Sequence, residues 1–141
     1  MDTQPVIKEV TINAPISKVW QAITQKEKMK EWYFDLAEFK PEVGFEFRFE
    51  AGEENKTYLH LCKVTEVVEG KKLVHSWRYA GYQGNSFVSW ELFEENGKTR
   101  LVLTHTGLET FPESNPDFAK KNFEMGWSEI IGKSLIEYLE K

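Results

Sequence analysis

The chain of 141 residues suits one domain, residues 1–141, which can bury a core without a metal or a disulfide. Its formal net charge of −5 argues against nucleic acid and anionic membrane surfaces as partners, because both are bound largely through Lys and Arg. The single cysteine, Cys62, excludes an intramolecular disulfide, and no apolar run approaches the roughly 20 residues of a membrane span. The first residues lack the basic and apolar stretches of a secretory signal, so we expect a cytoplasmic protein.

The first third of the chain carries one strand signal followed by two helix signals. β-branched residues over Val6–Ile12 predict a strand, which ends at Pro15. Proline fits the first turn of a helix, and apolar residues then recur at helical spacing: Ile16, Val19, Trp20 and Ile23. A second short helix is predicted from Lys26 to Trp32, before Pro41 and Gly44 mark a loop.

From residue 45 onward the hydrophobic period changes to two. Phe45, Phe47 and Phe49 alternate with charged residues, which is the pattern of a strand with one buried face. Further strands are predicted over residues 58–67, 73–79, 87–94 and 99–106. Asn96-Gly97 separates the last two strands and is a strong hairpin signal, because both residues tolerate positive φ.

The Asn96-Gly97 turn predicts the register of these last two strands. With the two residues in the turn, Trp90 pairs with Leu103 and Val88 pairs with His105. The core face then collects Val88, Trp90, Leu92, Leu101, Leu103 and His105. Alternation along the two preceding strands leaves their mutual register open but allows all three histidines, His60, His75 and His105, to point inward.

The last third of the chain reads as a loop and a long helix. Turn-forming residues fill the segment 107–116, which is either a lid carrying Phe111 or an ordinary connector. Asp117 is predicted to cap the helix that follows, and Glu129 is predicted to pair with Lys133 on its exposed face. The apolar stripe of this helix comprises Phe123, Trp127, Ile130, Ile131, Leu135, Tyr138 and Leu139.

This order of elements predicts an α+β fold, in which a curved antiparallel sheet of about six strands wraps around the long C-terminal helix. Five stretches carry a resemblance to known proteins: Met29–Tyr33, Gly44–Phe49, Leu73–Tyr79, Thr99–Leu108 and Gly126-Trp127. In this order they resemble the Hsp90-ATPase-activator homologue family of the helix-grip superfamily (START-like, Bet v 1-like). Val43 and Cys62 depart from the family pattern, since many members have glycine there. The resemblance implies a pocket and not a particular reaction.

A helix laid across a curved sheet tends to leave an apolar cavity. The side chains predicted to line it and to contact a ligand are Phe45, Phe47, Trp77, Trp90, Leu103, His75, His105, Trp127 and Ile131. A filled hydrophobic core is the alternative interpretation of the same set. We predict no metal, because the histidines lie on separate strands without a local ligand motif. We also predict no cofactor and no catalytic residue, because the sequence carries no nucleophile elbow, phosphate-binding glycine loop or Cys-x-x-Cys motif. The resemblance implies a structural role for His105.

Three functional hypotheses follow. The first is a module that binds a hydrophobic small molecule; Arg78 is expected to face solvent, although at a pocket mouth it would pair with a ligand carboxylate. The second, implied by the resemblance, is a protein-interaction domain that acts on an Hsp90-type chaperone in a stress response. The third is a cyclase- or hydrolase-like enzyme that uses His75 or His105 with a nearby carboxylate.

Overall fold

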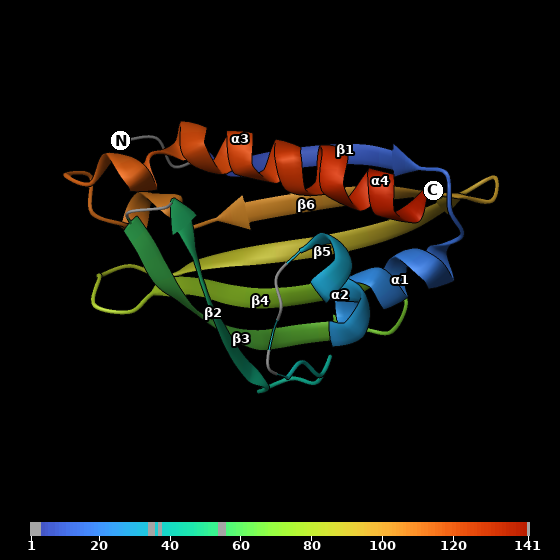
Figure 1. Ribbon diagram of the computed structural model, residues 1–141, viewed down its shortest axis with the longest axis horizontal. Helices are drawn as coiled ribbons and strands as arrows, with labels where there is room; N and C mark the ends of the chain where they lie inside the picture. Colours follow the sequence, from blue (N-terminus) through green and yellow to red (C-terminus); the bar gives the residue numbers. More distant parts are fainter. Residues whose placement is uncertain (1–3, 34–35, 37, 54–55, 141) are drawn as a thin grey trace.

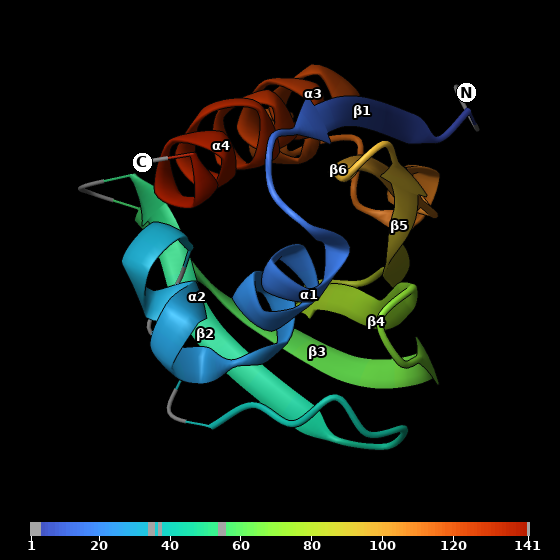
Figure 2. The same ribbon diagram turned by 90° about the vertical axis from the view of Figure 1, so that its right-hand side faces the viewer.

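The computed structural model describes residues 4–33, 36, 38–53 and 56–140. This part of the chain forms an antiparallel sheet of six strands in the order β1-β6-β5-β4-β3-β2. The strands are β1 (Val6–Ile12), β2 (Glu46–Glu53), β3 (Lys56–Val68), β4 (Lys72–Tyr79), β5 (Ser86–Glu95) and β6 (Lys98–Thr106). The sheet curves strongly, and the helices lie on its concave side (Figures 1 and 2). The predicted α+β fold is confirmed.

Two short helices follow β1 as predicted, namely α1 (Ile16–Thr24) and α2 (Lys26–Trp32). Figure 2 shows α1 inside the curve of the sheet. The amphipathic spacing explains this position, because Val19, Ala22 and Ile23 lie on one face of α1 and are buried. The indole N–H of Trp32 donates to the carbonyl of Ala22 over 2.9 Å and so holds α2 against α1.

The C-terminal helix runs without a break through α3 (Lys120–Glu129), a π turn η3 (Ile130–Ser134) and α4 (Leu135–Leu139). Its buried side chains recur every four residues: Phe123, Trp127, Ile131 and Leu135. On an α-helix each such step overshoots a full turn by about 40°. The wider π turn absorbs this drift and keeps the buried stripe facing the sheet. Within the described residues no helix is long and apolar enough to cross a membrane.

The prediction that Asp117 caps this helix is wrong. Helix α3 begins at Lys120, and the capping position is Ala119, whose side chain makes no capping bond. Asp117 lies instead in a short 3-10 turn, η2 (Pro116–Phe118), which Asn115 caps by accepting the Asp117 N–H over 3.0 Å. The turn-forming pair Asn115-Pro116 therefore starts a separate 3-10 turn, which ends at Phe118 before α3 begins.

The predicted ion pair between Glu129 and Lys133 is absent. The described side chains form ion pairs that include Lys72–Glu66, Arg100–Glu9 and Arg100–Glu95, and neither Glu129 nor Lys133 takes part in these pairs. The π turn begins directly after Glu129, so four residues no longer bring the two side chains onto one helix face.

The segment between β6 and α3 is packed against the fold. It contains a second 3-10 turn, η1 (Leu108–Thr110), and the side chain of Phe111 is buried. The rings of Phe111 and Tyr79 lie 5.2 Å apart, and the hydroxyl of Thr110 donates to the carbonyl of Gly107 over 2.6 Å. These contacts favour the connector interpretation over a lid.

The strand registers place all three histidines on the concave side. Trp90 pairs with Leu103 and Val88 with His105, as the hairpin predicted. The register between β3 and β4, left open by the sequence, pairs His60 with Tyr79 and is shifted by a bulge after Val64. His60, His75 and His105 are 6%, 3% and 0% exposed, so each is buried in the core.

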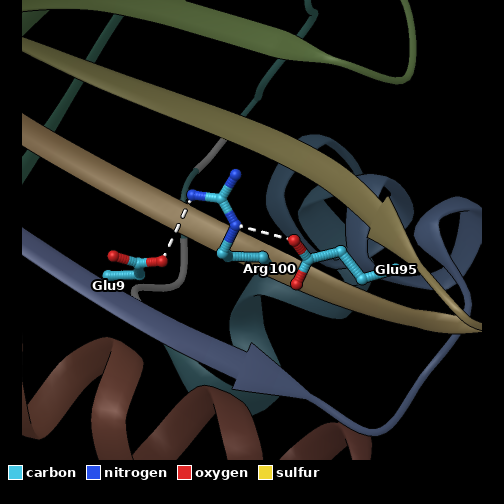
Figure 3. Close-up of polar contacts among 3 residues, drawn as sticks. All are labelled: Glu9, Glu95 and Arg100. Carbon is cyan, nitrogen blue, oxygen red and sulfur yellow. Dashed lines mark hydrogen bonds and ion pairs between the residues drawn. The ribbon is translucent and has the colours of Figure 1, made fainter.

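The convex face of the sheet is a solvated surface. Arg100 on β6 lies between Glu9 on β1 and Glu95 on β5, at 3.2 Å and 3.1 Å (Figure 3). Its guanidinium also lies 4.4 Å from the centre of the Phe93 ring. Arg78 is exposed, as predicted, on a strand whose neighbouring Trp77 and Tyr79 point inward. A binding site is therefore expected on the concave side.

Candidate functional site

A cleft of about 640 Å³ opens between α3 and the strands β2, β3 and β4. The sheet contributes Ala51, Tyr58, His60, Trp77 and Tyr79. The 3-10 turn η2 and the C-terminal helix contribute Asp117, Phe118, Asn122, Phe123, Met125, Gly126, Trp127, Glu129 and Ile130. Helix α3, which forms one wall of the cleft, lies away from α1 and α2 (Figure 1). Its volume is that of a typical small-molecule pocket.

Gly126 keeps one wall of the cleft open. This residue lies in the middle of α3 and lines the cleft. A Cβ atom built there would meet no other atom within 4 Å, so any side chain would project into free space. Glycine inside a helix costs about 1 kcal/mol relative to alanine. The helical backbone of α3 does not require a glycine at this position.

The opposite end of the concave side is closed by aromatic packing. A void of only about 10 Å³ remains there, bordered by Phe47, His75, Trp90 and the rings of Trp32 and Tyr33. Trp90 packs edge-on against Trp32 at 6.2 Å, and Phe47 packs against Phe39 at 5.1 Å. A space of this size holds one water molecule at most.

The structure divides the predicted site residues among three places. Trp77 and Trp127 line the cleft, and their rings lie 5.4 Å apart. Phe47, His75 and Trp90 border the small void. The remaining four, Phe45, Leu103, His105 and Ile131, line neither space; Phe45 is half-buried and the other three are fully buried. Ligand contact stays a prediction for all nine.

Several residues of the cleft were not predicted from the sequence. Alternation along β4 placed Tyr79 beside Trp77, and this signal was sufficient to include Tyr79. Assigning Tyr58 and His60 to the cleft required the register between β3 and β4, which the sequence left open. Assigning Asp117 and Asn122 to the cleft required the boundary between η2 and α3, which local sequence does not specify well.

His105 belongs to a buried hydrogen-bonded chain. The indole N–H of Trp127 donates to His105 Nδ1 over 3.0 Å. His105 Nε2 therefore carries the ring hydrogen and donates to the hydroxyl of Ser86 over 2.8 Å, and that hydroxyl donates to the carbonyl of Trp77 over 2.7 Å. Burial, with a smaller contribution from the nearby His75, lowers the pKa of His105 to about 3.

His75 forms a similar bonded pair. Trp90 donates its indole N–H to His75 Nε2 over 3.1 Å, so Nδ1 carries the hydrogen and donates to the carbonyl of Ser76 over 3.0 Å. Burial lowers the pKa of His75 to about 4. Both nitrogens of His75 and of His105 are thus bound to neutral groups, and the carboxylate that the enzyme hypothesis requires is not among these partners.

The outer end of the cleft is polar. The hydroxyl of Tyr58 donates to Asp117 Oδ2 over 2.6 Å and accepts from the Asn115 amide over 3.2 Å. His60 bonds the Tyr58 carbonyl through Nδ1 at 2.9 Å, and burial lowers the pKa of His60 to about 4. Within the described ranges, no group of three or more His, Cys, Asp and Glu residues is placed to hold a metal ion.

Two aromatic groups form the inner wall. The indole N–H of Trp77 donates to the hydroxyl of Tyr79 over 2.9 Å, and burial raises the pKa of that hydroxyl. Tyr79 also stacks on Phe118 with ring centres 4.6 Å apart. Cys62 is buried behind this wall, and burial raises the pKa of its thiol, which removes the thiolate that a nucleophile would need.

Comparison with solved structures identifies the fold. Protein MLL2253 from Mesorhizobium loti is 26% identical with a TM-score of 0.80, and the match covers 97% of each chain. Protein BH1534 from Bacillus halodurans is 26% identical with a TM-score of 0.73, over 96% of each chain. DynU16, a protein of the dynemicin biosynthetic locus, is 23% identical with a TM-score of 0.80; all of this chain matches 48% of DynU16.

The sequence comparisons identify the family. No curated protein matches the chain. The family described as "Activator of Hsp90 ATPase homolog 1-like protein" matches residues 13–140, which is nearly the whole length. The match includes the Met29–Tyr33, Thr99–Leu108 and Gly126-Trp127 stretches that carried the resemblance. The chain therefore belongs to the family of Activator of Hsp90 ATPase homolog 1-like proteins.

Proposed function

We propose that this protein binds a small hydrophobic molecule in the cleft between α3 and the strands β2, β3 and β4. The observation that carries the proposal is the open volume of about 640 Å³, which contrasts with the void of about 10 Å³ beside Phe47, His75 and Trp90. A ligand of drug size fits this volume, and the rings of Trp77, Trp127 and Phe118 would contact it.

The comparisons support a role in holding or delivering small molecules. DynU16 shares the fold and is named for a biosynthetic locus, where small molecules are made. The neutral partners of His75 and His105 give no acid–base pair, so the proposal is binding and not catalysis.

Gly126 provides the sharpest test of this proposal. Gly126→Phe would place a ring in the cleft without a clash or a strained backbone, since a Cβ there meets open space. The matched control is Gly132→Phe, on the same helix, where a Cβ also meets open space but outside the cleft. Both variants are expected to fold, because each replaces a helical glycine.

The measurement is a thermal-shift screen with uncharged bicyclic molecules such as 1-naphthalenemethanol, followed by native mass spectrometry. Ligands are expected to raise the Tm of the wild type and of Gly132→Phe, and to leave that of Gly126→Phe unchanged. A broad screen without a binder, or binding that Gly126→Phe does not weaken, would contradict the proposal.

A second candidate function rests on the family itself. Its description names activators of the Hsp90 ATPase, so a co-chaperone role on an Hsp90-type ATPase is the alternative proposal. The test is the ATPase rate of the chaperone from the same organism. An increase at saturating protein would support this role, and an unchanged rate would remove it.

A further inference from the structure

We infer that the ligand of the proposed cleft is an organic cation, a protonated or quaternary amine on a ring skeleton. This inference rests on the proposed binding function and adds the chemical class of the ligand. It follows from three properties of the cleft: the sign of its charges, its remaining hydrogen-bonding capacity and its aromatic walls.

The charged side chains of the cleft are acidic. Asp117 and Glu129 line it, and the described lining residues include no Lys or Arg. The ion pairs of the described side chains do not involve Glu129, because the π turn that follows separates it from Lys133. Arg78, the residue considered for a ligand carboxylate, points to the opposite face of the sheet. The cleft thus attracts positive charge and repels negative charge.

The donor groups of the cleft are already engaged by the protein. Tyr58 donates to Asp117, and the amide of Asn122 donates to the carbonyl of Pro116 over 2.9 Å. The indoles of Trp77 and Trp127 donate to Tyr79 and His105.

Among the described lining residues, the Tyr79 hydroxyl hydrogen is the side-chain donor for which the structure places no acceptor. One neutral donor does not offset the desolvation of a ligand carboxylate beside two acidic side chains. The Glu129 carboxylate, in contrast, can accept hydrogen bonds from an ammonium group.

The walls of the cleft are the kind that bind cations. The rings of Trp77 and Trp127 lie 5.4 Å apart, and Tyr58 and Phe118 lie 5.1 Å apart nearer the rim. Aromatic faces attract ammonium groups through their quadrupole, most strongly where water is excluded. A bicyclic amine would therefore place its rings between helix and sheet and its cationic group near the rim carboxylates.

Three probes with one skeleton separate charge from hydrophobicity: 1-naphthylmethylamine, 1-naphthalenemethanol and 1-naphthoic acid. Isothermal titration at pH 7.5 is expected to give at least tenfold tighter binding of the amine than of the acid, with the alcohol between them. Raising the ionic strength should reduce the preference for the amine, because the carboxylates are at the rim and are screened by salt.

Charge variants locate the effect. Glu129→Gln and Asp117→Asn are expected to weaken amine binding severalfold and to weaken alcohol binding much less, because the charge that each variant removes faces the cleft. The matched control is Glu124→Gln, which removes the same charge from an exposed position of α3 outside the cleft and should change neither.

The inference would be overturned if the acid bound as tightly as the amine, or if Glu129→Gln and Glu124→Gln had equal effects. In either case, binding of the alcohol would leave the proposed function intact. Binding of none of the three probes, or binding that Gly126→Phe does not weaken, would contradict the proposed function and the inference together.

Discussion

The indole N–H of Trp127 donates to Nδ1 of His105 over 3.0 Å and so joins the C-terminal helix to strand β6. This bond fixes the ring hydrogen of His105 on Nε2 and directs it to Ser86. Trp127 also lines the cleft, so the same side chain is anchored in the core and presents its ring to a ligand. The position of one cleft wall therefore depends on a buried histidine.

Replacement of His105 tests this anchoring. His105→Gln cannot serve both Trp127 and Ser86 at the imidazole positions, and it leaves at least one buried polar group without a partner. We expect the free energy of unfolding to fall by about 2–3 kcal/mol, which urea denaturation measures. Thr104→Ala, the outward neighbour on β6, should change stability by less than about 0.5 kcal/mol. Equal stability of the two variants would contradict a structural role for His105.

The buried histidines predict a loss of stability in mild acid. The pKa values of His60, His75 and His105 are lowered to about 4, 4 and 3 in the fold, whereas in the unfolded chain each is near 6.5. Below pH 6.5 the unfolded chain binds protons that the folded protein does not, so stability falls as the pH falls toward 4. From pH 7.5 to 5.5 the loss is about 1 kcal/mol per histidine.

Urea denaturation at these two pH values measures the effect. His60→Phe, which retains an aromatic ring stacked on Phe49, removes one titrating group and should reduce the pH dependence by about a third. Stability that is constant between pH 7.5 and 5.5 would show that the imidazoles accept protons in the folded state.

The hydroxyl of Tyr58 is expected to hold in place the segment that leads into α3. It bonds Asp117 at 2.6 Å and Asn115 at 3.2 Å, and so ties η2 to strand β3. Tyr58→Phe keeps the ring and removes both bonds, which should lower stability by about 1 kcal/mol and speed hydrogen exchange in residues 115–119. Exchange in β5 should not change. Unaltered exchange at residues 115–119 would mean that backbone turns alone hold this segment.

Much of the fold was predictable because strong local patterns specify it. The Asn96-Gly97 turn predicted the pairing of Trp90 with Leu103, and the period of two predicted which side chains of β5 and β6 are buried. The bulge after Val64 and the register it produces were not predictable, since the turn between β3 and β4 carries no comparable signal.

The site was less predictable than the fold, because a cleft forms where packing is incomplete. Sequence patterns identify apolar residues that point inward, but they do not distinguish Leu103 in the filled core from Trp77 at a cavity wall. Gly126 contributes to the room beside the helix, because a Cβ atom there would meet open space. The four-residue spacing from Phe123 to Leu135 was a usable signal for the π turn after Glu129.

The central claim, that the cleft beside α3 is the binding site, is tested most directly by the indole N–H signals in ¹H–¹⁵N spectra. Trp77 and Trp127 line the cleft, whereas Trp20, Trp32 and Trp90 do not. Titration with 1-naphthalenemethanol is predicted to shift the signals of Trp77 and Trp127 and to leave that of Trp20 in place. Binding that shifts Trp20 and leaves Trp77 and Trp127 unchanged, or no shift at all, would contradict the account.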